Sequence, residues 1–122
     1  MPTVAVVEDN ADNRLLLQAI LGDHYDLVEY ENGLEALAGL GRQRPDVVLL
    51  DISLPGMDGT EVLQSIRANA DLRTLPVIAL TAHAMAGDRE KFLSLGFDDY
   101  VTKPIVDEAK LFSAIKRLLT PP

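Results

Sequence analysis

Hydrophobic and polar positions divide the chain into short apolar runs separated by longer segments of helical period. Five segments have the length and composition of β-strands: residues 3–7, 26–30, 46–50, 76–80 and 98–102. Residues 47–50 and 77–80 are apolar without interruption, as parallel strands buried on both faces are. Residues 26–30 alternate between polar and apolar side chains, which is typical of an edge strand with one wetter face.

Between these strands, apolar residues recur every three or four positions, which predicts amphipathic helices. The helical stripes are Leu16, Leu17, Ile20 and Leu21 after Asp12; Leu34, Leu37 and Leu40; Val62, Leu63 and Ile66; residues 87–95; and residues 107–119, with Leu111, Phe112, Ile115, Leu118 and Leu119 on one face. Asp58 is expected to cap the third helix, which opens at Gly59, and Gly96 to end the fourth. Prolines at 121 and 122 end the last helix. The alternation predicts a doubly wound (βα)5 domain of the α/β class, with a five-stranded parallel sheet.

Composition limits the classes of function. The length and a hydrophobic content of 48% predict one domain over residues 1–122 with a real core. A net charge of −8 argues against direct binding to nucleic acid or to anionic membranes. The absence of cysteine excludes disulfides, thiolate nucleophiles and cysteine-ligated zinc. No apolar stretch approaches the roughly 18 residues of a membrane span, and no signal peptide fits before the first strand, so a cytoplasmic location is expected.

Acidic residues follow two of the buried strands. Glu8 and Asp9 follow the first strand, and Asp51 follows the third. With the strand order 2-1-3-4-5, these strands flank the point where strand order reverses, and open α/β sheets bind ligands at that edge. Two like charges about 4 Å apart repel by roughly 4 kcal/mol at an effective dielectric of about 20, so such a cluster requires a cation, a raised pKa, or both. Taken singly, either acidic site is equally well explained as a turn or cap residue.

Two further polar residues follow strands at the same edge. Thr81 comes directly after the fourth strand, and Lys103 with Pro104 after the fifth. Alone, such a threonine more often caps the next turn, and a lone lysine is usually a solvated surface charge. Beside a carboxylate cluster, however, a lysine can neutralise the acids or a transferred phosphoryl group.

Together, these residues resemble the site of response-regulator receiver domains of two-component signalling: Glu8, Asp9, Asp51, Thr81 and Lys103. Residues 51–59 match the loop of that family, with Leu54 where methionine is frequent. The resemblance covers essentially the whole chain and implies a flavodoxin-like fold. It also implies that Asp51 accepts a phosphoryl group from phosphohistidine on a histidine kinase or a histidine phosphotransfer protein.

The resemblance implies roles for the other site residues as well. The Mg²⁺ ligands would be Glu8, Asp9, Asp51 and the backbone carbonyl of Ser53. Lys103 would bind one phosphoryl oxygen and Thr81 would donate a hydrogen bond to another. Oxygen ligands of this kind suit Mg²⁺, and phosphoryl transfer depends mainly on positioning and charge neutralisation.

The family resemblance further implies a conformational switch at Thr81 and Tyr100, which changes the surface of the fourth helix, fifth strand and fifth helix. A tyrosine at this place is by itself more often a half-buried side chain with its hydroxyl in water. Ser53 and His83 stand at positions that tune phosphoryl lifetime in the family, and the Lys103–Pro104 peptide is cis there. The resemblance is compatible with a monomer or with a phosphorylation-dependent dimer.

Several alternatives remain open. A phosphatase with an aspartate nucleophile typically carries a second aspartate two residues after the first, where this chain has Ser53. A flavodoxin-like nucleotide binder requires a phosphate loop after the first strand, where Glu8 and Asp9 would repel phosphate. The chain also fits the receiver segment of a hybrid histidine kinase. The interpretation that fits most residues is a phosphoacceptor with Mg²⁺-dependent autodephosphorylation, not a turnover enzyme.

Overall fold

Strands and helices alternate along the chain in a computed structural model that describes residues 1–82, 88–103 and 108–119. The elements are β1 (Thr3–Val7), α1 (Ala11–Leu21), β2 (Asp26–Tyr30), α2 (Gly33–Arg42), β3 (Val47–Asp51), α3 (Gly59–Ala68), β4 (Val77–Thr81), α4 (Asp88–Leu95), β5 (Asp99–Thr102) and α5 (Glu108–Leu119). This succession confirms the (βα)5 prediction. Within the described ranges, no helix combines the length and the apolar character that a bilayer span requires.

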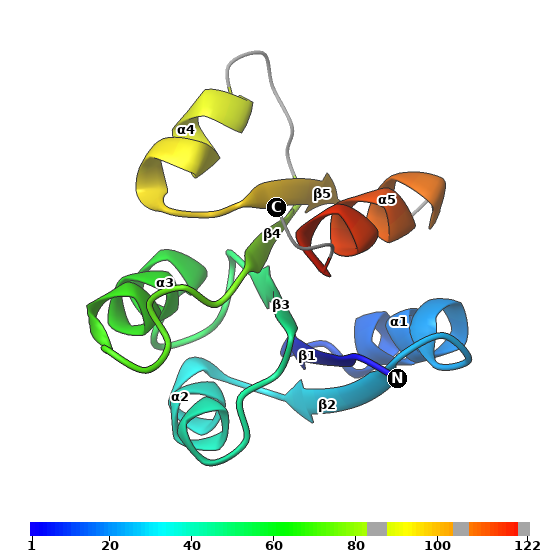
Figure 1. The fold of residues 1–122 in the computed structure, drawn as a ribbon, viewed down its shortest axis with the longest axis horizontal. Coiled ribbons are helices and arrows are strands. Elements are labelled where there is room, and N and C mark those ends of the chain that lie inside the picture. The colour runs from blue at the N-terminus through cyan, green and yellow to red at the C-terminus, as the bar shows by residue number, and fades with distance from the viewer. Residues whose placement is uncertain (83–87, 104–107, 120–122) are drawn as a thin grey trace.

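The strands form one parallel sheet in the order β2-β1-β3-β4-β5, as predicted. Helices α1 and α5 cover one face of the sheet, and α2, α3 and α4 cover the other (Figure 1). Strand β1 lies between β2 and β3. The chain therefore first adds β2 on one side of β1 and later places β3 on its other side. The carboxyl ends of β1 and β3 therefore flank the reversal point, where α/β sheets bind ligands.

Each central strand contributes side chains to two hydrophobic cores, because successive residues of a strand point to opposite faces of the sheet. Val4 and Val6 pack in the core beneath α1 and α5, together with Leu17 and Leu111. Ala5, Val7 and their counterparts on β3 and β4 pack beneath the other three helices. The central strands β3 and β4 are buried over their whole length, which explains their uninterrupted apolar sequence.

Strands β3 and β4 end one residue later than their apolar patterns indicate. Asp51 pairs in register with Leu80, and Thr81 pairs with Thr102, so both polar residues belong to the sheet. The backbone ladder continues because its hydrogen bonds do not depend on the polarity of the side chain. Two site residues are thereby carried on rigid strands instead of on the following loops.

In two helices, one leucine of the predicted stripe is exposed. Leu16 of α1 is 37% exposed and Leu34 of α2 is 71% exposed, although both were assigned to buried stripes. Besides the predicted Leu40, the buried face of α2 consists of two glycines, Gly33 and Gly39, and Ala36. Small residues let this helix lie close to its neighbours, which a hydrophobic pattern alone does not show.

Two helix caps confirm the sequence prediction. The Asp58 carboxylate accepts hydrogen bonds from the Glu61 backbone at 3.0 Å and from the Thr60 hydroxyl at 2.6 Å, and these bonds lower the pKa of Asp58. Gly96 follows α4 with a φ of +111°, a left-handed conformation that favours glycine. The residues predicted to end the last helix, 120–122, lie outside the described part of the chain.

Gly59 is the point where α3 packs directly against the end of β3. A Cβ atom there would overlap the backbone oxygen of Asp51 and lie 2.7 Å from the Cα of Ile52. We therefore expect Gly59→Ala to lower the free energy of unfolding by about 3 kcal/mol, measured by urea denaturation. Gly41→Ala is the matched control, since among the described residues no heavy atom outside its chain neighbours and its own helix backbone lies within 4 Å of the added Cβ. The control should raise stability by about 0.5–1 kcal/mol through helix propensity, and equal effects of the two variants would contradict the packing argument.

Candidate functional site

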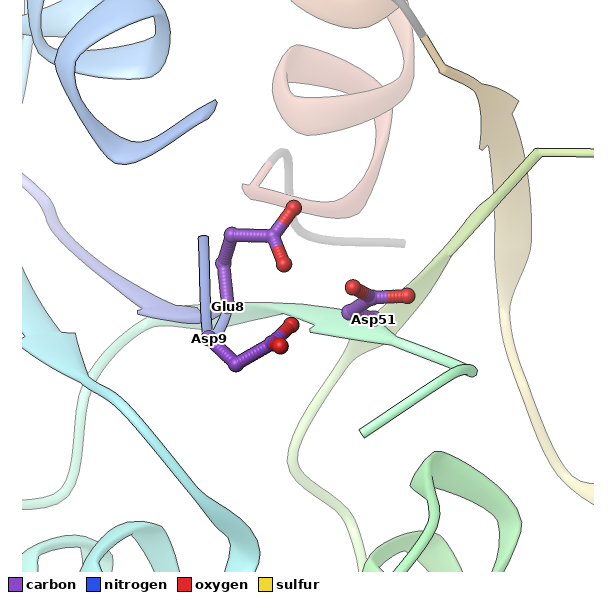
Figure 2. A group of neighbouring side chains, drawn as sticks. All are labelled: Glu8, Asp9 and Asp51. Atoms are coloured by element: carbon purple, nitrogen blue, oxygen red, sulfur yellow. The ribbon is translucent and has the colours of Figure 1, made fainter. Parts of the chain in front are cut away.

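Three carboxylates meet beyond the carboxyl ends of β1 and β3. Val7 and Leu50 are partners in the sheet, so Glu8 and Asp9 lie next to Asp51. One oxygen of each of the three carboxylates lies within 4.8 Å of the others, and Figure 2 shows the three groups gathered in the space between the two strand ends. The structure thus brings together the three acids that the strand pattern predicted to converge, and they are called the acidic cluster below.

The acidic cluster is largely shielded from solvent. Glu8 is 0% exposed and Asp51 is 1% exposed, whereas Asp9 is exposed. Oε2 of Glu8 has no hydrogen-bond partner among the described residues. A buried carboxylate oxygen without a donor is costly, so this atom needs either a proton or a cation.

Burial and charge separate the pKa values of the two buried acids. Desolvation, helped by the neighbouring Asp51 carboxylate, raises the pKa of Glu8 to about 7. Burial alone would also raise the pKa of Asp51, but hydrogen bonds from Lys103 and the Ser53 backbone, together with the charge of Lys103, outweigh it and lower that pKa. A proton in the cluster is therefore held by Glu8, and Asp51 stays ionised.

Lys103 brings the positive charge of the site. Its Nζ lies 2.8 Å from Oδ2 of Asp51 and 3.1 Å from Oε1 of Glu8. Its backbone N–H donates to the carbonyl of Thr81 at 2.7 Å, which holds the residue after β5 against the end of β4. Burial would lower the pKa of Lys103, but hydrogen bonds and charges from the two acids raise it, so the ammonium is fully charged at neutral pH. One ammonium facing the three carboxylates of the acidic cluster leaves the site negative, which favours a divalent cation.

The Asp51 carboxylate is held by donors on both oxygens. Oδ1 accepts a hydrogen bond from the Ser53 backbone at 2.9 Å, while Oδ2 accepts from Lys103. Thr81 is buried at the end of β4, the strand next to β3. All the predicted phosphoryl-transfer residues therefore lie at one edge of the sheet, on three adjacent strands or directly after them.

The first turn of α1 supplies contacts that the sequence analysis did not assign. Asn13 Nδ2 donates to Oε1 of Glu8 at 2.8 Å, and Arg14 donates to the backbone oxygen of Glu8, also at 2.8 Å. The helix begins at Ala11, with Asn10 as its N-cap, directly after the acids. An asparagine N-cap at position 10 is a signal in the sequence for this start, and it would have placed the first turn above the acidic cluster.

Tyr100 lies on β5, apart from the carboxylates. Its ring centroid is 5.5 Å from that of Phe92 on α4, and Nζ of Lys110 on α5 lies 4.5 Å from the ring centre. The half-buried ring thus contacts both helices that flank β5. Tyr100 precedes Lys103 by three residues. The tuning role predicted for Ser53 stays a prediction, and two further ones, a tuning role for His83 and a cis peptide before Pro104, concern residues outside the described ranges.

Comparison with known proteins gives consistent matches. The profile of one family, described as the response regulator receiver domain, matches residues 4–116. The chain is 41% identical over 104 residues to the polar-differentiation response regulator DivK of Brucella anthropi, covering 84% of this chain and 85% of DivK. It is 43% identical over 108 residues to the sensor protein GacS of Pseudomonas syringae pv. syringae, but the match spans only 12% of the length of GacS.

A solved structure agrees with these sequence matches. The receiver domain of the sensor histidine kinase PA1611 from Pseudomonas aeruginosa superposes with a TM-score of 0.86 at 37% identity, covering 97% of both chains. That crystal structure contains a magnesium ion coordinated in its active-site cleft.

Proposed function

The chain belongs to the response regulator receiver domain family of two-component signalling, and on this premise we propose that Asp51 is its phosphoacceptor. The observation that carries the assignment is the Asp51 carboxylate itself, which is buried beside two other acids and held 2.8 Å from the Lys103 ammonium. Its lowered pKa keeps it ionised and therefore nucleophilic at neutral pH. The donor would be a phosphohistidine on a histidine kinase or a histidine phosphotransfer protein.

The proposed transfer forms an acyl phosphate. A carboxylate oxygen of Asp51 attacks the phosphorus, the phosphorus–nitrogen bond of the donor breaks, and the imidazole leaves with the electron pair and takes up a proton. Phosphoryl transfer needs little covalent help from the protein, so positioning and charge neutralisation carry most of the catalysis. Lys103 supplies positive charge to a phosphoryl oxygen, and the Thr81 hydroxyl donates to another.

The residues of the site fit Mg²⁺. The proposed ligands are the three carboxylates of the acidic cluster and the backbone carbonyl of Ser53, all of them the hard oxygen donors that this ion prefers. The buried, partnerless Oε2 of Glu8 and the surplus of carboxylates over Lys103 both favour a divalent cation. When bound, the ion offsets the negative charge that would otherwise repel an incoming phosphoryl group.

The proposed output is a change in the surface formed by α4, β5 and α5. The phosphoryl group would draw Thr81 inward, and the Tyr100 ring, which now packs between Phe92 and Lys110, would move. Asp99 joins the elements of this surface through ion pairs to Arg89 on α4 at 3.7 Å and to Arg117 on α5 at 3.0 Å. A shift of β5 would therefore disturb its ion pairs with both helices.

The relatives support two molecular contexts for the chain. DivK is matched over most of its length, and GacS over a small segment, so the chain could act as a stand-alone regulator or as the receiver segment of a hybrid kinase. We propose a single receiver domain over residues 1–122, in the cytoplasm, that works as a monomer or as a phosphorylation-dependent dimer. Its acidic net charge favours protein partners over nucleic acid.

Acetyl phosphate tests the proposed function without a cognate kinase. Incubation with acetyl phosphate and Mg²⁺ is expected to add one phosphoryl group per chain, read by intact mass, and excess EDTA should prevent the addition. The adduct should disappear slowly after the donor is removed, and faster with Mg²⁺ than with EDTA. Sustained turnover of an aryl phosphate, with no covalent adduct, would instead support the phosphatase alternative.

A further inference from the structure

The contact between Asn13 and Glu8 joins α1 to the acidic cluster. Asn13 Nδ2 donates to Oε1 of Glu8 at 2.8 Å, and the acceptor is completely buried. Oε2 of the same carboxylate has no partner among the described residues. An amide group donates this hydrogen bond without bringing a charge of its own, so it orients the carboxylate and does not compete with a cation for it.

The first turn of α1 holds Asn13 in place for this contact. Its backbone N–H donates to the side chain of Asn10, the N-cap, at 3.1 Å. Arg14, the next residue, donates to the backbone oxygen of Glu8 at 2.8 Å and pairs with Glu31 at 3.3 Å. Both the donor and the main chain of its acceptor are therefore fixed by the same helical turn.

Asn13 and Lys103 act on the same oxygen of Glu8. Lys103 Nζ lies 3.1 Å from Oε1, so this atom carries two donors while Oε2 carries none. A glutamate side chain has several rotatable bonds, and ordering it costs conformational entropy when a cation binds. Hydrogen bonds that orient the carboxylate beforehand reduce that cost. Mutation of residues that hydrogen-bond to metal ligands commonly changes the affinity for the metal by about 10–100-fold.

We propose that Asn13 is a positioning residue of the cation site, which holds Oε1 of Glu8 and so presents Oε2 to a divalent cation. The inference rests on the proposed function, because it requires that the acidic cluster binds such an ion. Asn13 acts through its hydrogen bond to Glu8 and is not itself a proposed ligand of the ion.

Asn13→Leu removes the donor, keeps the number of side-chain heavy atoms and places a good helix former in α1. Binding of Mn²⁺ to the unphosphorylated full chain, followed by electron paramagnetic resonance, reads the site without reference to phosphorylation. We expect the dissociation constant for Mn²⁺ to rise about tenfold, and the Mg²⁺ concentration that displaces Mn²⁺ to rise in parallel. If circular dichroism shows that Asn13→Leu does not fold, Asn13→Ala is measured in its place.

Asn32→Ala is the matched control. Asn32 caps α2 by accepting from the Glu35 backbone at 2.9 Å, so its loss costs stability of the same order without removing a donor to Glu8. The control should bind Mn²⁺ within about twofold of the wild-type protein. Equal loss of affinity in both variants, or unchanged affinity in Asn13→Leu, would overturn the role of Asn13 while leaving the cation site in place. Absence of Mn²⁺ binding to the wild-type protein would overturn both this inference and the proposed cation site.

Discussion

Asp51→Asn is expected to reduce labelling by acetyl phosphate by more than about a thousandfold, since an amide is no nucleophile toward phosphorus. The substitution keeps the size of the side chain, and the carbonyl oxygen of the amide can still accept the hydrogen bond from Ser53. The loss of labelling would therefore reflect the missing nucleophile and not misfolding. Intact mass after incubation with acetyl phosphate and Mg²⁺ gives the measurement.

The same variant should lose little stability when Mg²⁺ is absent. The lowered pKa of Asp51 means that its ionised form stabilises the folded protein, but Glu8 remains to pair with Lys103, so we expect the free energy of unfolding to fall by only about 1 kcal/mol. Asp58→Asn is the matched control, because it makes the same change seven residues later, at the N-cap of α3, and asparagine keeps the helix cap. Labelling that persists in Asp51→Asn, or that is lost equally in Asp58→Asn, would refute the assignment.

Lys103→Met should have a larger effect on stability. It leaves Glu8 and Asp51 buried without their ammonium partner, and breaking a buried pair from one side typically costs about 3 kcal/mol. Urea denaturation in EDTA would measure the loss. Saturating Mg²⁺ should recover part of it, because a ligand that binds the folded state stabilises that state.

Lys91→Met is the control for Lys103→Met, since Lys91 is an exposed residue of α4 and its loss should change stability by less than about 0.5 kcal/mol. Phosphorylation of Lys103→Met should remain possible at a reduced rate. We expect beryllofluoride, which mimics a phosphoryl group, to change the spectrum of Tyr100 in the wild-type protein when Mg²⁺ is present, and this change should be lost in Lys103→Met. A normal response at Tyr100 in Lys103→Met would argue that Lys103 does not couple the phosphoryl group to β5.

Much of the fold could be predicted from periodicity because helices and strands impose different repeats on their buried residues. The uninterrupted apolar runs of β3 and β4 identified central strands, and Asp58 and Gly96 marked helix ends through local chemistry. The errors occurred where burial depends on neighbours. Leu34 repeats with the other leucines of α2 yet is exposed, since small residues form the face that packs.

The candidate site was predictable where a strand delivers a polar residue to the edge of the sheet. Asp51 and Thr81 follow buried runs directly, so their positions were apparent before their neighbours were known. Asn13 was not apparent, because an asparagine inside the first turn of a helix has many uses and only the packing of α1 selects one. Its contact with Glu8 depends on where that turn lies relative to the acidic cluster.

The sequence by itself determined the type and order of the elements, because the periods of two and of about 3.6 residues are local properties of the backbone. It also determined that acids, a hydroxyl and a lysine end the strands. Only the tertiary structure decided that Lys103 meets Glu8, 95 positions earlier, and that the meeting takes place out of water. Such contacts depend on strand order and burial, and burial is what turns ordinary carboxylates into a site that favours a proton or a cation.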